Sequence, residues 1–294
     1  METLNEQLKQ VMQKKKLSFT TVSKALGIAR SGLNMWINGN YPGNTSKIEN
    51  AVKAFIEREK IRETNYSIDF MMTSIAKILF EVAEICHIQG EIGICYGRAG
   101  LGKTSAVKEY AKLNSDVILI EADLGYTPKI LFSEIHNKLG FSECGTVYKM
   151  MNEIVDKFKD SGRLIIIEEA EHLPYKSLEL IRRLHDKAGI GILLTGMPRL
   201  IDNIRGKRCQ YEQLYSRIGI AKKLNDLTIT DIKTILQNVM PEGEAFIEQF
   251  NMFSFGNTRI LTKLIMRSAN MAKINNENLS LSIIAEASKI ILSR

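Results

Sequence analysis

The stretch that decides the fold is Gly97-Arg98-Ala99-Gly100-Leu101-Gly102-Lys103-Thr104. It matches the phosphate-binding loop pattern GxxxxGK[ST] at every specified position, and an apolar run at residues 92–96 precedes it. Glycines let backbone N–H groups close around phosphates, and a helix that follows points its positive end at them. Lys103 can reach the β- and γ-phosphates, and the Thr104 hydroxyl can coordinate Mg²⁺. We therefore expect these eight residues and Ser105 to bind a nucleotide, ATP.

A second run supplies the acidic partner that such a nucleotide site needs. Leu164-Ile165-Ile166-Ile167-Glu168-Glu169 is a buried strand pattern that ends in two carboxylates, where ligands of open α/β sheets collect. Glu168 would hold Mg²⁺, and Glu169 would polarise the attacking water. The alternative is a buried strand followed by a solvated acidic turn of Glu168, Glu169 and Glu171.

The pattern of the chain around these motifs predicts an α/β core that contains a parallel sheet flanked by helices. An all-helical segment precedes this core and another follows it. The expected strands lie at residues 92–96, 117–122, 164–167, 191–195 and 219–224, and the expected helices at 104–112, 129–139, 147–159 and 175–187. The expected domains are a helical domain at 1–58, a linker or fraying helix end at 59–66, the α/β core at 67–225 and a helical lid at 226–294.

Composition excludes several classes of protein. With 294 residues, 45% hydrophobic and 25% charged, the chain is long enough for about two domains and is not globally disordered. No apolar run approaches the roughly 20 residues of a membrane span, and no leader precedes the first helix. The four cysteines lack zinc-site spacing and are too few for a disulfide framework. We expect a cytoplasmic protein with no membrane partner and no metal beyond Mg²⁺.

The net charge of +7 is concentrated in two segments. Residues 1–66 contain 11 basic and 6 acidic side chains, and residues 199–223 contain seven basic and two acidic ones. Concentrated positive charge indicates a polyanion, first of all double-stranded DNA. A solvated basic surface with no such partner is the alternative. In the second segment Arg205, Lys207 and Arg208 resemble an exposed loop that could face DNA.

The first basic segment has the pattern of two short helices joined at Gly27. The apolar positions that would pack them are Val22, Ala25, Leu26, Ile28, Leu33 and Ile37. The pattern resembles the helix-turn-helix of the lambda-repressor class, which implies that the second helix contacts DNA. The expected DNA contacts are Arg30, Ser31 and Asn34 on that helix and Lys14, Lys15 and Lys16 upstream. A small helical domain with no DNA role is the alternative.

Taken in order, the motifs resemble those of the AAA+ ATPases, more narrowly the transposon target-selection ATPases of the phage Mu B type. Residues 164–173 are similar to that family's hhhhDEADHL segment, with Glu168 in place of the usual Asp. Residues 191–197 are similar to its sensor 1 strand, with Met197 at a position that is often Asn and Thr195 as a substitute. Residues 214–218 resemble the arginine-finger segment, and residues 256–261 the sensor 2 segment of the lid.

The resemblance implies a function and its catalytic residues. Lys103, Glu169, Arg217 and Arg259 would act on ATP, with Arg217 reaching the nucleotide of a neighbouring subunit. The implied protein is a slow, DNA- or partner-stimulated ATPase that assembles on duplex DNA as a ring or helical filament, captures target DNA and activates a partner transposase or integrase. Its source would be prokaryotic or phage-encoded. The alternatives are a helicase loader or replication-initiation ATPase, and a regulator whose DNA binding is gated by ATP.

Overall fold

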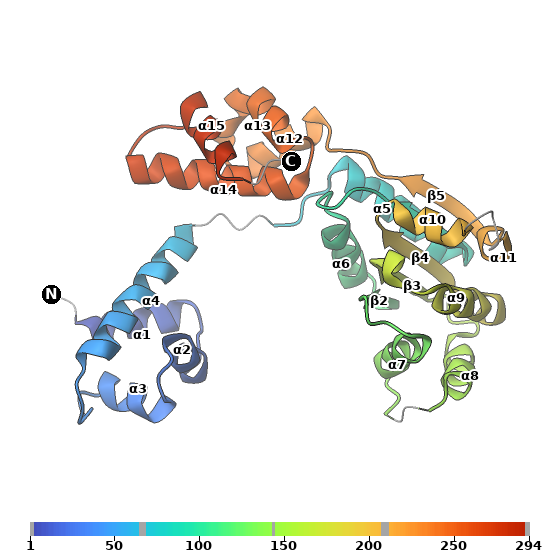
Figure 1. Ribbon diagram of the computed structural model, residues 1–294, viewed down its shortest axis with the longest axis horizontal. Coiled ribbons are helices and arrows are strands. Elements are labelled where there is room, and N and C mark those ends of the chain that lie inside the picture. Colours follow the sequence, from blue (N-terminus) through green and yellow to red (C-terminus); the bar gives the residue numbers. More distant parts are fainter. Residues whose placement is uncertain (1–2, 65–68, 143–144, 207–211, 292–294) are drawn as a thin grey trace. The chain divides into compact units, whose positions relative to one another are not determined.

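The computed structural model describes residues 3–64, 69–142, 145–206 and 212–291 (Figure 1). The chain divides into two compact units, residues 1–67 and 68–294. Each unit folds around hydrophobic core residues of its own. Among the described residues, no helix has both the length and the apolar character needed to cross a bilayer.

The first unit is all-helical. Its helices are α1 (Leu4–Lys14), α2 (Phe19–Leu26), α3 (Arg30–Ile37) and α4 (Ser46–Thr64). Thr3 and Glu6 form a capping box that starts α1, and the Ser18 side chain caps α2. The last helix, α4, continues to Thr64 and therefore includes most of the segment expected as a linker or fraying helix end.

The three residues between α2 and α3 form a tight turn. Gly27 has φ +67°, a left-handed conformation that costs glycine little, and it ends α2. Leu33 and Trp36 on α3 pack into the core of this unit. Ala25, in contrast, is exposed rather than packed, because the face of α2 that carries it points away from the core.

The second unit contains a five-stranded parallel sheet in the order β2-β3-β4-β1-β5, which confirms the predicted α/β fold class. The strands are β1 (Ile92–Tyr96), β2 (Val117–Glu121), β3 (Leu164–Glu168), β4 (Gly191–Gly196) and β5 (Ile218–Lys223). Each strand and each of the four predicted helices begins and ends within one residue of its expected position. The central strands β3 and β4 are buried along their whole length, as apolar strands between two helical layers must be.

Helices cover both faces of the sheet. The flanking elements are α5 (Ser74–Gln89), α6 (Lys103–Leu113), α7 (Pro128–Lys138), α8 (Val147–Phe158), η1 (Ala170–His172), α9 (Tyr175–Ala188), α10 (Arg199–Arg205) and α11 (Glu212–Tyr215). Helices α5 and α6 share one core cluster with β3 and β4, and α7, α8 and α9 share the cluster on the opposite face. Because alternate side chains of a strand point to opposite faces, Ile166 belongs to the first cluster and Ile165 to the second.

The lid follows β5 and is all-helical, as predicted (Figure 1). Its elements are α12 (Ile229–Val239), η3 (Pro241–Phe246), α13 (Ile247–Ser254), α14 (Thr258–Asn275) and α15 (Leu281–Lys289). Lid residues such as Ile232, Leu236 and Leu261 lie in the same core cluster as residues of α5 and α6. The lid and the sheet therefore share one continuous hydrophobic core.

One buried carboxylate ties the first lid helix to the start of α5. Asp231, 6% exposed, accepts hydrogen bonds from the Ser74 backbone N–H (2.6 Å) and from the Thr228 N–H (2.9 Å) and hydroxyl (2.8 Å). Although burial alone would raise the pKa of Asp231, the hydrogen bonds from Ser74 and Thr228 outweigh it and lower the pKa. The carboxylate thus caps α12 and joins segments 157 residues apart.

We expect Asp231→Ala to lower the free energy of unfolding by about 3 kcal/mol, because it removes a helix cap and leaves buried donors of Ser74 and Thr228 unpaired. Since the folded-state pKa is lowered, this contribution is complete above the ordinary carboxyl pKa of about 4 and is lost as the pH falls through the folded-state value. Urea unfolding at pH 7 and at pH 3 measures the difference.

The matched control is Glu244→Ala, which removes an exposed carboxylate that pairs with Lys233 in the same lid. It should leave the unfolding midpoint nearly unchanged. An Asp231→Ala protein as stable as the wild type at pH 7, or a difference that widens at pH 3, would contradict the role assigned to Asp231.

Candidate nucleotide site

The phosphate-binding loop leaves β1 and is held close to the rest of the sheet. The Gly97 N–H donates to the Gly196 carbonyl at the end of β4 (3.1 Å). A Cβ atom at Gly97 would lie 2.9 Å from both the Leu101 side chain and the Leu224 carbonyl, so only glycine fits there. Gly100 and Gly102 have φ of +82° and +87°, which L-residues rarely adopt. The motif glycines are therefore required by this backbone path.

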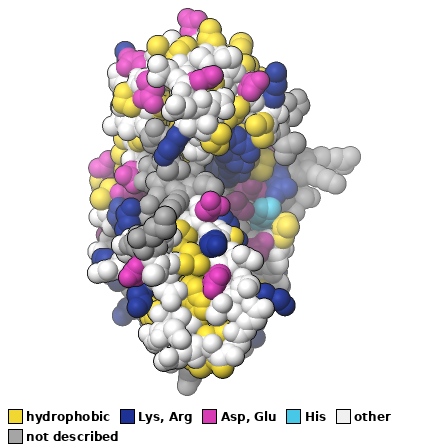
Figure 2. Space-filling view, turned by 90° about the vertical axis from the view of Figure 1, so that its left-hand side faces the viewer, with side chains coloured by type: hydrophobic (Ala, Val, Ile, Leu, Met, Phe, Trp, Pro, Cys, Tyr) yellow, Lys and Arg dark blue, Asp and Glu magenta, His cyan; other side chains and the backbone are white. Residues whose placement is uncertain are grey.

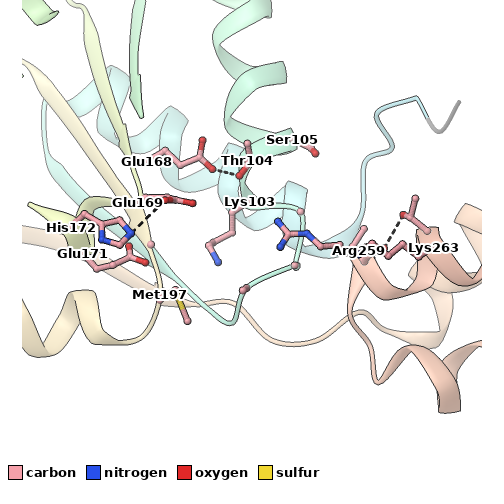
Figure 3. A pocket seen from close by; sticks show the side chains of 16 residues that line it. Lys103, Thr104, Ser105, Glu168, Glu169, Glu171, His172, Met197, Arg259 and Lys263 are labelled. Carbon is pink, nitrogen blue, oxygen red and sulfur yellow. Dashed lines mark hydrogen bonds and ion pairs between the residues drawn. The ribbon is translucent and has the colours of Figure 1, made fainter. Parts of the chain in front are cut away.

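A cavity of about 400 Å³ lies beside the loop. Its walls are the loop itself, the start of α6, the carboxyl ends of β3 and β4, and the first turns of α14 in the lid (Figure 3). Predicted site residues that line it are Ala99, Gly100, Gly102, Lys103, Thr104, Ser105, Glu168, Glu169 and Arg259. Gly97, Arg98 and Leu101 do not line it, and Leu101 is buried in the core beneath the loop. Most of the predicted site thus converges on one cavity.

Lys103 lies at the centre of this site. Its ammonium donates to the carbonyl oxygens of Gly97 (2.8 Å) and Arg98 (2.7 Å), so it folds back onto its own loop. Burial lowers the pKa of Lys103, while the carboxylates of Glu171 and Glu168 oppose that shift. An anionic phosphate can compete with two neutral carbonyls for this cation, because hydrogen bonds to charged acceptors are the stronger ones.

Glu168 is buried at the end of β3. It is 2% exposed and accepts a hydrogen bond from the Thr104 hydroxyl through Oε1, while its Oε2 is buried with no partner among the described residues. Burial raises the pKa of Glu168, and the hydrogen bond from Thr104 opposes that shift. An unpaired buried carboxylate oxygen next to a threonine hydroxyl fits a divalent cation, since Mg²⁺ takes oxygen ligands from one or two carboxylates together with phosphates.

Glu169 differs from Glu168 in both conformation and exposure. Its backbone is left-handed (φ +53°), which turns the chain sharply from β3 into η1, and its side chain is 53% exposed. Its carboxylate lines the cavity, and its Oε2 lies 3.5 Å from His172 Nε2. Glu171, in contrast, is only 7% exposed, so a solvated acidic turn does not describe this segment.

The lid contacts the phosphate-binding loop directly. Asn257, the N-cap of α14, donates from Nδ2 to the Ala99 carbonyl (2.8 Å), and the Arg259 N–H donates to the Gly100 carbonyl (3.1 Å). The Arg98 guanidinium contacts Asp226 (Nε to Oδ1, 3.0 Å) and the Phe255 carbonyl (3.1 Å). The loop is thus fixed by the lid as well as by the sheet.

Several lining residues were not predicted. Glu171, His172, Thr258, Thr262 and Lys263 line the cavity. The Asn-Thr pair that starts α14 carries an N-cap signal, and Lys263 follows Arg259 by one helical turn, so both could have been placed from the sensor 2 segment. Nothing in the local pattern indicates that Glu171 is buried in this wall.

A second cavity, of about 310 Å³, adjoins the first and shares Gly102, Ser105, Thr258 and Thr262 with it. Its other lining residues are mostly apolar and include Phe70, Met71 and Ile235, with Asp69 as an acidic group. Residues 69–71 precede α5 and carry no motif, so no local pattern assigns them to a site. The two cavities together provide a charged compartment and an apolar one.

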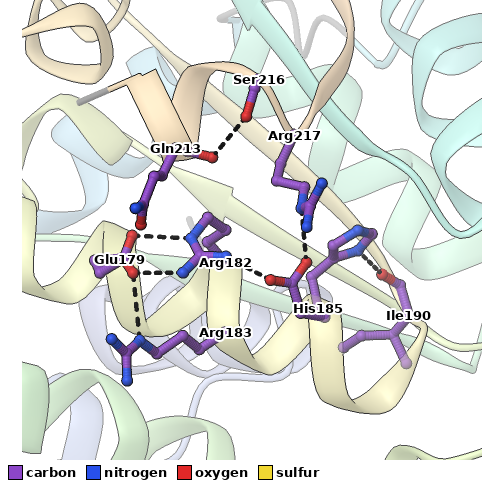
Figure 4. A network of polar contacts seen from close by, with 9 residues as sticks. Glu179, Arg182, Arg183, His185, Ile190, Gln213, Ser216 and Arg217 are labelled. Carbon is purple, nitrogen blue, oxygen red and sulfur yellow. Dashed lines mark hydrogen bonds and ion pairs between the residues drawn. The ribbon is translucent and has the colours of Figure 1, made fainter.

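Arg217 lies outside the cavity. Its Nε donates to Asp186 Oδ1 (3.0 Å), and Asp186 also pairs with Arg182 on the same face (Figure 4). The side chain is 53% exposed and is therefore accessible from outside the subunit. Its role as an arginine finger for a neighbouring subunit stays a prediction. Met197 lines the cavity, whereas the Thr195 hydroxyl is buried, does not line it and has no partner among the described residues.

The predicted DNA contacts fall into three groups. Arg30, Ser31 and Asn34 are exposed together on α3 and line a shallow cavity with Phe19. Lys14 and Lys16 are exposed, while the Lys15 ammonium lies 2.7 Å from Glu59 and joins α1 to α4. Arg205 lies over the ring of Tyr215, with its carbon Cζ 5.3 Å from the ring centre, and Lys207 and Arg208 lie outside the described residues.

Known proteins are similar to this chain in sequence or in fold. Residues 87–204 match the AAA domain family. The chain is 29% identical over 275 residues to the Mu-like prophage FluMu DNA transposition protein B of Haemophilus influenzae, covering 89% of this chain and 94% of that protein. It is 22% identical over 290 residues to the ATP-dependent target DNA activator B of Escherichia phage Mu, and the match covers 95% of this chain and 92% of that protein. The solved ORC2 protein of Aeropyrum pernix has the same fold, with a TM-score of 0.54 at 18% identity over 75% of this chain and 67% of that one.

The parallel sheet, the phosphate-binding loop and the matching domain define an AAA-type P-loop ATPase. Within this class, the chain is similar over most of its length to the B proteins of Mu-type DNA transposition. The resemblance predicted from the order of its motifs is thereby confirmed.

Proposed function

We propose that this protein is an ATP-dependent DNA-binding ATPase that assembles on double-stranded DNA, captures it as a transposition target and activates a partner transposase or integrase in the cytoplasm of a bacterium. The observation that carries the proposal is the single cavity in which Lys103, Thr104, Glu168, Glu169 and Arg259 meet. The names of the two transposition relatives support the choice of pathway.

ATP would occupy both cavities. The triphosphate would lie on the loop N–H groups and the start of α6, with Lys103 turned from the loop carbonyls to the β- and γ-phosphates. The base would enter the second cavity, between the apolar side chains of residues 70–71 and Ile235. Arg259 from the lid would add a positive charge beside the phosphates. The lid contacts with the loop would hold Arg259 in this place.

Thr104 and Glu168 would hold Mg²⁺. The described residues include no cluster of three His, Cys, Asp or Glu side chains arranged for a metal ion, so phosphate oxygens would supply the other ligands. Bound Mg²⁺ would neutralise charge on the β- and γ-phosphates. The unpaired buried Oε2 of Glu168 supports this assignment.

Hydrolysis needs a base for the attacking water, and Glu169 is best placed to serve. Its carboxylate lines the cavity and is half exposed, so a water can approach it. Glu168, in contrast, is buried and accepts a hydrogen bond from Thr104. Glu169 would accept a proton as the water oxygen bonds to the γ-phosphorus and the bond to the bridging oxygen breaks, giving ADP and phosphate. Slow turnover suits a switch that holds DNA until hydrolysis releases it.

DNA would bind through phosphate contacts from the two basic segments. Arg30, Ser31 and Asn34 on α3 are exposed together, as a DNA-contacting helix requires. On the face shown in Figure 2, Lys and Arg side chains are interspersed with Asp and Glu rather than gathered in one patch. Assembly of several subunits would therefore sum weak contacts along the duplex, and binding would fall steeply with salt.

The proposal is tested with Glu169→Gln, which keeps the shape of the cavity but cannot accept the proton. We expect hydrolysis to fall by about 10²–10⁴-fold, while ATP-dependent retention of fluorescent duplex DNA persists because the bound state no longer decays. Anisotropy with ATP, with ADP and without nucleotide, at two salt concentrations, measures retention.

The control is Glu109→Gln, which changes a carboxylate on α6 that pairs with Lys112 outside the cavity. It should hydrolyse ATP and release DNA like the wild type. DNA binding that is equal with ATP, with ADP and without nucleotide would contradict the proposal.

A second prediction concerns Arg217. If it acts on ATP held by a neighbouring subunit, Arg217→Ala should reduce DNA-stimulated hydrolysis by about 10³-fold or more, the effect of a transition-state arginine. Nucleotide affinity of the monomer should not change, because Arg217 lies outside its own cavity. Turnover by mixtures of Arg217→Ala and Glu169→Gln proteins measures whether the residues act in trans. Unchanged turnover of Arg217→Ala alone would refute the assignment.

A further inference from the structure

We propose that His172, supported by Arg199, is a positioning residue that fixes the carboxylate of Glu169 in the nucleotide cavity. This inference rests on the proposed role of Glu169 as the base for water. It assigns a function to His172, which the acidic motif segment contains without a stated role, and to Arg199, which lies outside the nucleotide motifs.

His172 contacts both other side chains, Glu169 and Arg199, and Arg199 does not line the cavity. Glu169 Oε2 lies 3.5 Å from His172 Nε2, and the Arg199 guanidinium lies 3.1 Å from Nδ1 and 3.4 Å from Nε2 of the same ring (Figure 3 shows the first contact). Glu169 precedes η1, His172 ends it, and Arg199 starts α10. Both Glu169 and His172 line the cavity.

One tautomer of the imidazole fits the proposal. Arginine can only donate, so a ring nitrogen that accepts from it carries no proton. The Arg199 guanidinium lies nearer to Nδ1 (3.1 Å) than to Nε2 (3.4 Å), and we take Nδ1 as the acceptor, which places the proton on Nε2, 3.5 Å from Glu169 Oε2. His172 then presents an N–H to one carboxylate oxygen and leaves the other oxygen of Glu169 for the proton of the attacking water.

Glu169 needs such a partner more than its neighbours do. Its side chain is 53% exposed, and among the described residues His172 is the one basic side chain recorded in contact with its carboxylate. Glu168 is held by Thr104, and Glu171 is buried in the wall. A half-exposed glutamate with no fixed partner would sample several rotamers, and only some of them would face a water at the γ-phosphate.

The backbone supports the same arrangement. The His172 N–H donates to the Glu169 carbonyl (2.9 Å), which closes η1 and places residue 172 beside the side chain of residue 169. The side chain of His172 is 17% exposed, so the ring is largely fixed by its surroundings. Next to it, the Asn203 amide donates to the Glu171 carbonyl (2.9 Å) and joins η1 to α10. His172 on η1 and Arg199 on α10 therefore lie on two elements that a hydrogen bond joins.

The test is steady-state hydrolysis and ATP affinity of the full chain carrying His172→Ala or His172→Gln. We expect His172→Ala to lower kcat about tenfold, the lower end of the effect of losing an orienting partner, with ATP affinity within about twofold of the wild type. His172→Gln, whose amide can donate in place of Nε2–H, should recover most of kcat. Arg199→Ala should lower kcat less than His172→Ala does, because the imidazole remains.

His87→Ala is the matched control. This histidine is also largely buried (12% exposed) and lies 3.1 Å from a carboxylate, Asp116, but away from the cavity. The kcat of the His87→Ala protein should equal that of the wild type. Thermal unfolding of each variant checks that the proteins are folded, and if His172→Ala is unfolded, the comparison of His172→Gln with His172→Phe decides the question.

Single-turnover hydrolysis of labelled ATP in the Glu169→Gln background distinguishes the positioning role of His172 from the role of Glu169 as the base. If His172 acts through Glu169, adding His172→Ala to Glu169→Gln causes no further loss. Wild-type kcat in His172→Ala, or the same tenfold loss in both backgrounds, would overturn the positioning role alone. Wild-type turnover in Glu169→Gln would overturn the role of Glu169 and the positioning role together.

Discussion

The contact on which the nucleotide site depends is the one between the phosphate-binding loop and the N-terminus of α14. The loop carbonyls of Ala99 and Gly100 accept hydrogen bonds from Asn257 and from the Arg259 N–H. A Cβ atom at Gly100 would lie 2.4 Å from Asn257 Oδ1, so the lid can approach only because this residue is glycine. These contacts bring the lid residues Thr258, Arg259 and Lys263 to the cavity, where the sheet alone would leave it open.

The charges of the site are arranged around an anion. Lys103 is partly buried near Glu168 and Glu171, and its ammonium donates to two loop carbonyls. Buried charges are tolerated where they are paired, and the surplus positive charge of Arg259 and Lys263 lies on the lid side of the cavity. A triphosphate with Mg²⁺ would place negative charge between the two sides.

Local patterns predicted much of this molecule. The five strands and the four predicted helices begin and end within one residue of expectation, because apolar runs and the glycine loop are local signals. Asp226 could not be predicted as part of the site, since its role depends on segments that meet only after folding. Arg98, for example, contacts Asp226 across 128 residues of sequence. The same limit applies to Asp69 and Phe70, which have no motif and form the wall of the second cavity.

We propose that the lid contacts hold the phosphate-binding loop ready to bind ATP, and Arg98→Ala tests this role of the lid. The variant removes the contacts to Asp226 and the Phe255 carbonyl without touching the cavity wall. Calorimetric titration should show ATP affinity reduced about three- to tenfold. This is the loss expected when a partly exposed ion pair, which contributes at most about 1 kcal/mol, is removed together with one hydrogen bond. Lys108→Ala, which breaks an exposed pair with Glu121, should bind ATP like the wild type. Unchanged ATP affinity in Arg98→Ala would contradict this role of the lid.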